Sequence, residues 1–311
     1  MWGGNNVFKN LLAKMGKGGA KVDLKLEKTE FLPGDTVKGE LVITGGMVEQ
    51  RINGADVELQ LVIRANGKPF SHTIETIPIR ESFVIPPDNW RSFPFSCVLP
   101  KELPVSGNPV TYSFVTRLDI EGAVDHTDHD YIKVQPPDRL QKVLQALSRL
   151  GFREKYGSRS FNGYTQEFEL FPTQLLHGKV EEVEFAAAVE EGGLRLLLEV
   201  DVHSWTGEKE IKRELFLENS LLDEEEQLKE RLSQVLTEMA ENPSSWQWSI
   251  SGKHKHGSLH WKGMIGGFAA GVLGAMVLSE LTEEAVEGLE EATDLDLPEG
   301  DFDLADGMFD D

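Results

Sequence analysis

Cysteine is almost absent from this sequence. Cys97 is the only one among 311 residues, which excludes an intramolecular disulfide framework and favours a reducing compartment. Positive charge is also scarce, because 31 Lys and Arg stand against 53 Asp and Glu, for a formal net charge of −22. Such a chain lacks the basic surface that phosphate contacts require, so we expect no nucleic-acid partner. No apolar run of signal-peptide length opens the sequence, and we expect a cytoplasmic protein.

Motifs that carry catalysis are missing as well. The sequence has no glycine motif that cradles phosphate, no G-x-S-x-G and no H-E-x-x-H. Cys97 shares a strand face with Phe93, Phe95 and Leu99, so we predict a buried, inert thiol rather than a nucleophile. We therefore predict a protein that is not an enzyme and that needs no cofactor.

Alternating apolar and polar residues dominate the sequence up to about residue 222. This period of two is typical of half-buried antiparallel strands, and Gly, Pro and Asn turns separate the segments. In the first half the strands are predicted at 21–26, 37–43, 57–63, 73–79, 93–99, 110–120 and 131–134. We predict a mainly β protein with two antiparallel β-sandwich domains, at 21–136 and 161–222, together with a linker helix and C-terminal helical segments.

The other segments differ in composition. They are an N-terminal amphipathic segment (1–20), a basic linker helix (137–160), a helix (223–242), a Trp- and His-rich hairpin or loop (243–262), a Gly-rich apolar helix (263–280) and an acidic tail (281–311). The tail carries thirteen Asp and Glu with no Lys or Arg, and we predict that it is disordered.

The apolar segment Gly263–Leu278 raises the question of a membrane. Its sixteen uncharged residues would span roughly 24 Å as a helix, short of the roughly 30 Å of hydrocarbon in a bilayer. Gly263, Gly267 and Gly271 recur every four residues, which favours close helix packing or self-association. Peripheral membrane contact through this segment is the alternative.

A run of aspartate and histidine in the first half is the main candidate site. Asp125, His126, Asp128, His129 and Asp130 are residue types that ligate divalent cations. Asp and Thr are also preferred in turns, where their side chains bond nearby backbone N–H groups. A structural turn or interdomain contact and a metal site both remain open. The histidines 254, 256 and 260 are predicted to lie in a solvated loop.

The linker helix is the most basic part of the chain. Arg139, Lys142, Arg149 and Arg153 are either solvated helix charges or contacts for acidic groups, in this chain or in a partner.

The order of motifs resembles a known family. The turn Phe31-Leu-Pro-Gly-Asp-Thr-Val-Lys-Gly39 and the strand Phe93-Pro-Phe-Ser-Cys-Val-Leu-Pro-Lys-Glu-Leu-Pro104 are similar to arrestin-type domains. With Leu118-Asp-Ile120, Ala123-Val-Asp125 and Gln166-Glu-Phe-Glu169, they resemble the arrestin-like family of bacterial sporulation-control proteins.

This resemblance implies two arrestin-like lobes without catalytic activity. It also implies a scaffold or regulator that binds protein partners, among them the sporulation or cell-division machinery. Two alternatives stay open: a metal-dependent hydrolase that uses Asp125–Asp130, and a peripheral membrane adaptor that uses Gly263–Leu278.

Overall fold

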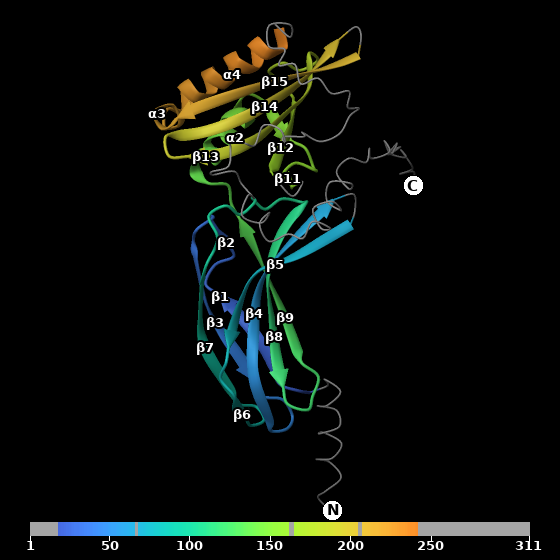
Figure 1. Ribbon diagram of the computed structural model, residues 1–311, viewed down its shortest axis with the longest axis vertical. Coiled ribbons are helices and arrows are strands. Elements are labelled where there is room, and N and C mark those ends of the chain that lie inside the picture. Colours follow the sequence, from blue (N-terminus) through green and yellow to red (C-terminus); the bar gives the residue numbers. More distant parts are fainter. Residues whose placement is uncertain (1–17, 66–67, 162–164, 205–206, 242–311) are drawn as a thin grey trace, which may run out of the picture.

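The computed structural model describes residues 18–65, 68–161, 165–204 and 207–241, which form two lobes (Figure 1). The first lobe holds nine strands: β1 (Lys21–Leu26), β2 (Glu30–Phe31), β3 (Thr36–Thr44), β4 (Gln50–Ala65), β5 (Lys68–Ile79), β6 (Phe83–Ile85), β7 (Trp90–Val98), β8 (Val110–Ile120) and β9 (His126–Val134). They form a sheet of order β1-β3-β7 and a sheet of order β2-β9-β8-β4-β5, in which β6 also pairs with β4. All pairs are antiparallel except β2 with β9.

The predicted alternation builds the core of this lobe. Inward-facing side chains of both sheets, such as Leu24, Leu41, Leu59 and Phe114, join one buried cluster. Cys97 is 7% exposed in the same cluster, so the prediction of a buried cysteine is confirmed, and burial raises the pKa of its thiol to about 12, which disfavours the reactive thiolate.

Gly39 explains one position of the family-like turn motif. A Cβ atom at this residue would lie 2.5 Å from the backbone oxygen of Lys25 on the paired strand β1. Because a backbone oxygen cannot rotate away as a side chain can, only glycine allows the two strands to approach this closely.

The second lobe contains one sheet among the described residues. Its strands are β10 (Phe152–Glu154), β11 (Ser160–Phe161), β12 (Gln166–Pro172), β13 (Val180–Glu190), β14 (Gly193–Ser204) and β15 (Gly207–Glu218), and its helices are α2 (Asp138–Arg149), α3 (Asn219–Leu222) and α4 (Glu225–Glu241). The sheet order is β10-β12-β13-β14-β15, with β11 on β12. The basic segment 137–160 is thus helical up to Arg149 and continues as strands and turns.

Helices supply the second layer of this lobe. Leu140, Leu232 and Leu236 from α2 and α4 share a core with Phe185 and Leu198 of the sheet. The mainly β, antiparallel class is confirmed, but the described residues between 161 and 222 form no second sheet. The physical reason is that α2 and α4 already occupy the apolar face of β12–β14, where the second sheet of a sandwich would pack.

The two lobes interlock through one apolar residue each. Val105 precedes β8 in the first lobe but is buried in the core of the second. Phe161 of β11 is buried in the core of the first lobe. The lobes therefore share their cores, unlike domains joined by a linker alone.

Gln166 reinforces this junction. Its side-chain amide accepts a hydrogen bond from Val105 N (2.6 Å) and donates to the oxygens of Val105 (2.7 Å) and Arg159 (3.0 Å). Gln166 is 1% exposed, and the pairing satisfies backbone groups that would otherwise be buried without partners.

Several predicted segments lie outside the described residues. They are nearly all of the N-terminal segment 1–20, the Trp- and His-rich segment, the Gly-rich segment and the acidic tail. No helix in the part of the chain that the structure describes is long and apolar enough to cross a bilayer.

Candidate functional site

The Asp/His run lies largely on a strand. β8 ends at Ile120, Gly122 turns the chain at φ +67°, and β9 begins at His126, five residues before the predicted start of this strand. Asp125 precedes β9, and its Oδ1 accepts a hydrogen bond from Ile120 N at 3.1 Å. Asp125 therefore shapes the turn between the two strands.

The run divides between two faces because successive side chains of a strand point to opposite sides. His126, Asp128 and Asp130 are half-buried, whereas His129 is exposed on the other face. The structure consequently places three of the five candidate metal ligands on one face, of which only Asp128 and Asp130 join a cluster close enough to hold an ion, and it places Asp125 and His129 elsewhere.

The three half-buried side chains face β1, the edge strand of the other sheet. His126 Nδ1 accepts a hydrogen bond from Val22 N at 3.3 Å, and Asp128 Oδ2 accepts one from Leu24 N at 3.2 Å. An edge strand normally leaves such N–H groups unpaired. These two side chains therefore close the seam between the sheets of the first lobe, which is a structural role for part of the run.

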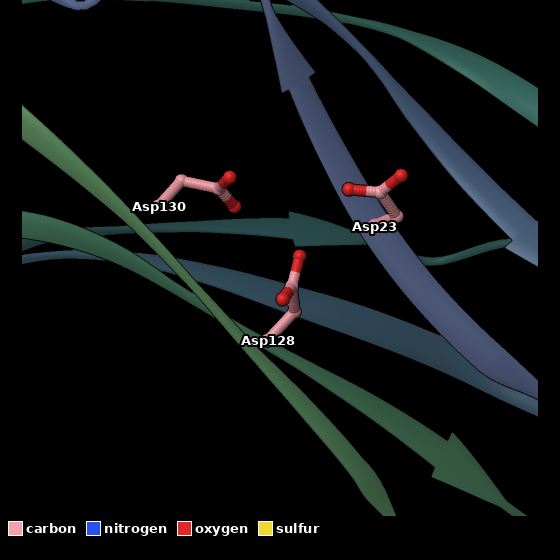
Figure 2. A group of neighbouring side chains, drawn as sticks. All are labelled: Asp23, Asp128 and Asp130. Carbon is pink, nitrogen blue, oxygen red and sulfur yellow. The ribbon is translucent and has the colours of Figure 1, made fainter.

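Asp23 completes a cluster of three carboxylates at this seam. It projects from β1 toward Asp128 and Asp130 of β9 (Figure 2), and one oxygen of each residue lies within 4.8 Å of the others. Carboxylate oxygens at this spacing suit Mg²⁺ or Ca²⁺. The cluster can equally be neutralised by a proton, and metal binding here stays a prediction.

The electrostatics of the seam favour a proton on Asp130. Burial, followed by the nearby Asp128 and Asp23 carboxylates, raises the pKa of Asp130 to about 7. Its Oδ2 is buried without a hydrogen-bond partner. Burial also lowers the pKa of His126, which suits a neutral imidazole that accepts the Val22 N–H bond.

A second group of carboxylates was not predicted. It covers the face of the second sheet opposite the helices, here called the carboxylate face, and consists of Glu167 and Glu169 on β12, Glu182 and Glu184 on β13, and Glu199 on β14. Glu167 and Glu199 are only 4% and 5% exposed. The available signal was the spacing of two within predicted strands, which puts each set of glutamates on one side.

Two lysines pair with this face. Lys155 forms an ion pair with Glu182, and Lys212 Nζ lies 3.1 Å from Glu199 Oε2. Burial nevertheless raises the pKa of Glu199 to about 8 and the pKa of Glu184 to about 7. Oxygens of Glu169, Glu182 and Glu184 also lie within 4.8 Å of one another.

A pocket of about 460 Å³ opens between the lobes. Its lining includes Tyr131 and Lys133 from β9 and Lys155, Tyr156 and Arg159 from the turn between β10 and β11. Tyr131 and Tyr156 are 72% and 86% exposed. The pocket thus offers two aromatic rings, one from each lobe, and a partly basic lining.

Arg159 holds this pocket in shape. Its Nη1 donates to Ser106 O at 2.8 Å across the junction, and its Nε and Nη2 donate to Glu154 at 2.8 and 2.9 Å. Arg159 has φ 70°, a left-handed conformation that is costly for a residue with a Cβ atom. The hydrogen bonds on both sides of the junction offset that cost.

The basic residues of the linker contact groups within the chain. Lys142 Nζ lies 2.8 Å from both Asp138 and Asp223, Arg149 pairs with Glu225, and Arg139 donates to backbone oxygens of residues 190, 191 and 193. Arg153 donates to Ser148, with 2.9 Å to its Oγ. These contacts fasten α2 to the second lobe. Gly263, Gly267 and Gly271 lie outside the described residues.

Comparisons with known proteins agree with this architecture. The family model described as "SpoOM protein" matches residues 8–204. The sporulation-control protein Spo0M of Bacillus subtilis (strain 168) is 33% identical over 259 residues, which cover 76% of this chain and 100% of the relative. The crystal structure of Spo0M from Bacillus subtilis matches with a TM-score of 0.54 and 31% identity, over 71% of this chain and 99% of that chain. This chain belongs to the Spo0M family of sporulation-control proteins.

Proposed function

We propose that this protein is a non-enzymatic cytoplasmic regulator that binds protein partners in the pocket between its lobes. The Bacillus relative is named a sporulation-control protein, and we extend that role to this chain. The resemblance of this sequence to arrestin-type domains supports a scaffold that acts by binding sporulation or cell-division proteins rather than by catalysing a reaction.

The exposure of Tyr131 and Tyr156 carries this proposal. A tyrosine with 72% or 86% of its surface in water leaves a large apolar ring unburied. Aromatic side chains are enriched at the centres of protein interfaces because a partner can bury the ring and bond the hydroxyl. The two rings come from different lobes and line the same pocket.

The lining also defines the kind of partner. Lys133 is exposed beside Tyr131 and adds positive charge, whereas Lys155 and Arg159 on the opposite wall already pair with Glu182 and Glu154. An extended segment with apolar and acidic side chains fits such a groove, since opposite charges steer association and the rings supply buried area.

The hydrolase alternative is weaker on this geometry. His126 and Asp128 already accept backbone hydrogen bonds from β1, and His129 lies on the other face of β9. A catalytic metal needs several convergent ligands with an open position, and the five candidates do not converge. Membrane recruitment through residues 263–278 concerns a segment outside the described residues.

Affinity capture with matched variants tests the proposal. The full-length chain, the double variant Tyr131→Ala/Tyr156→Ala and the control Trp90→Ala are used as bait in the producing cell, and captured proteins are quantified by mass spectrometry. Trp90 is also an exposed aromatic residue, 69% exposed, but it lies on β7 away from the pocket lining.

We expect each tyrosine ring to contribute more than about 1 kcal/mol to the binding free energy. The double variant should therefore lower recovery of specific partners by at least about tenfold. The Trp90→Ala bait should recover them like the unaltered chain. Equal recovery by all three baits, with all three folded, would contradict the pocket as the contact surface.

A further inference from the structure

Thr116 buries a hydroxyl group without a partner inside the first lobe. The residue is 0% exposed, and its Oγ1 forms no hydrogen bond within the part of the chain that the structure describes. A hydroxyl buried in this way costs free energy unless a ligand or a water molecule satisfies it. The neighbours of Thr116 therefore indicate what that ligand is.

The strand register places this hydroxyl beside the carboxylates of the seam. Thr116 alternates with Phe114 and Leu118 of β8, which belong to the buried core, so its side chain lies on the same inner face. It pairs directly with Asp128 of β9, and directly paired residues hold their Cβ atoms about 4.5–5.5 Å apart. Asp130 lies on that face two residues further along β9. Thr116 thus borders the cluster of three carboxylates (Figure 2).

Asp130 contributes a second unpartnered oxygen to this place. Its Oδ2 is buried and has no hydrogen-bond partner among the described residues, so it does not bond Thr116 Oγ1 either. A proton on Asp130 relieves the repulsion between carboxylates, but it leaves the threonine hydroxyl as it is. One ligand that contacts both oxygens would satisfy the two groups together.

The cluster has little positive charge of its own, which favours a cation as this ligand. Lys25 Nζ lies 3.9 Å from Asp23 Oδ2, but both side chains are 60% exposed, and such a surface pair contributes little. Within the described residues, no lysine or arginine forms an ion pair with Asp128 or Asp130. A water molecule could bond the two oxygens but would add no charge, whereas a cation supplies both the contacts and the charge.

The donor set fits Ca²⁺ better than Mg²⁺. Ca²⁺ holds its oxygen ligands at about 2.3–2.6 Å, so two of them can stand up to about 5 Å apart. The carboxylate oxygens of the cluster lie within 4.8 Å of one another. Mg²⁺ holds oxygens at about 2.0–2.1 Å and is usually bound by only about one or two carboxylates. Asp23 is exposed, which leaves the outer side of the ion open to water ligands.

We infer that the carboxylates of Asp23, Asp128 and Asp130 bind a calcium ion at the seam of the first lobe. The hydroxyl of Thr116 is a further ligand. Asp128 uses Oδ2 for the N–H of Leu24, so its other oxygen is available to the ion. The ion joins β1 to β9 and is structural rather than catalytic, and its site is separate from the pocket proposed for protein partners.

Titration calorimetry of the full-length chain with CaCl₂ tests the site. Asp23→Asn changes the exposed member of the cluster and spares the seam, and it should raise the Kd for Ca²⁺ at least about tenfold. Asp88→Asn, the same change in an exposed loop outside the cluster, is the matched control and should bind like the unaltered chain. The acidic tail adds the same background to all three chains. No binding by the unaltered chain, or an equal Kd in Asp23→Asn, would overturn the calcium site.

Thr116→Val tests the hydroxyl through two opposite effects. Without Ca²⁺ the variant should melt at the same temperature as the unaltered chain or higher, because it removes a buried polar group that has no partner. Its Kd for Ca²⁺ should nevertheless rise on the order of tenfold, because the ion loses a ligand. An unchanged Kd would show that Thr116 is not a ligand. Titration with MgCl₂ should give weaker binding to the unaltered chain, and tighter binding of Mg²⁺ would overturn the choice of ion.

Discussion

Asp128 and His126 supply the edge strand β1 with hydrogen-bond acceptors that a neighbouring strand would otherwise provide. They accept the N–H bonds of Leu24 and Val22, so the family-like carboxylates of this run stabilise the seam between two sheets. This arrangement places the Asp128 carboxylate beside Asp130. Burial and the repulsion between the two carboxylates raise the pKa of Asp130 to about 7, and a proton on Asp130 relieves that repulsion.

Replacing Asp128 should therefore separate its two effects. Asp128→Ala removes the acceptor of Leu24 N, and we expect it to lower the free energy of unfolding by about 1–3 kcal/mol. Asp128→Asn retains an acceptor oxygen and removes the repulsion with Asp130, so its loss should be smaller. Urea denaturation measures both. The control is His129→Ala on the exposed face, expected within about 0.5 kcal/mol of the unaltered chain. An alanine variant as stable as the parent would contradict the seam role.

Glu199 gives stability a dependence on pH. Its folded pKa, about 8, lies above the ordinary value of 4.5, chiefly because the side chain is buried. A raised carboxyl pKa means that the folded state binds more protons, so this contribution is full below about pH 4.5 and is lost as pH rises to about 8. Glu184, with a pKa of about 7, acts in the same direction.

Thermal unfolding between pH 5 and pH 9 checks this sign. The unaltered chain should lose stability across the range, whereas Glu199→Gln should depend less on pH. At pH 9 the glutamine variant should be the more stable, by an amount on the order of 1 kcal/mol. Glu214→Gln, which changes a glutamate paired with Arg195, is the matched control and should retain the parental slope. Parallel pH profiles for all three chains would show that Glu199 ionises freely.

At the scale of elements, the period of two was sufficient for most of the first lobe. The predicted strands at 21–26, 37–43 and 110–120 coincide with β1, β3 and β8 within a residue or two. The start of β9 was missed because Asp and His are residues that turns prefer, and only the pairing with β8 draws them into a strand.

The second lobe shows what period alone cannot decide. Alternation in β12, β13 and β14 indicated strands correctly, but it does not say whether helices or another sheet cover a given face. The glutamates at 167 and 169 and at 182 and 184 are spaced by two, which predicts that each pair lies on one side of its strand. Strands β12, β13 and β14 follow one another in the chain, but the gathering of charge depends on their pairing register, which only the fold supplies.

At the scale of the molecule, the junction between lobes determines whether the pocket has one shape. Val105 of the first lobe is buried in the core of the second, and Phe161 of the second lobe is buried in the core of the first. The side-chain amide of Gln166 forms hydrogen bonds with both backbone groups of Val105. No residue pattern predicts such an exchange, because Val105 is an ordinary apolar residue until the second lobe closes over it. A rigid junction is what a binding pocket lined from both lobes requires.

Gln166→Ala tests this rigidity. The substitution leaves the buried N–H and C=O of Val105 without the amide, at a cost of about 1–3 kcal/mol that falls on the junction rather than on either core. Calorimetry of the unaltered chain should show one cooperative transition, because each lobe contributes a residue to the core of the other. In the variant the lobes should melt in two resolved steps, and Tyr131 and Tyr156 should no longer act as one site. Gln141→Ala, on the exposed side of α2, should melt like the parent. A single transition in Gln166→Ala, within about 2 °C of the parent, would mean that Val105 and Phe161 alone hold the lobes together.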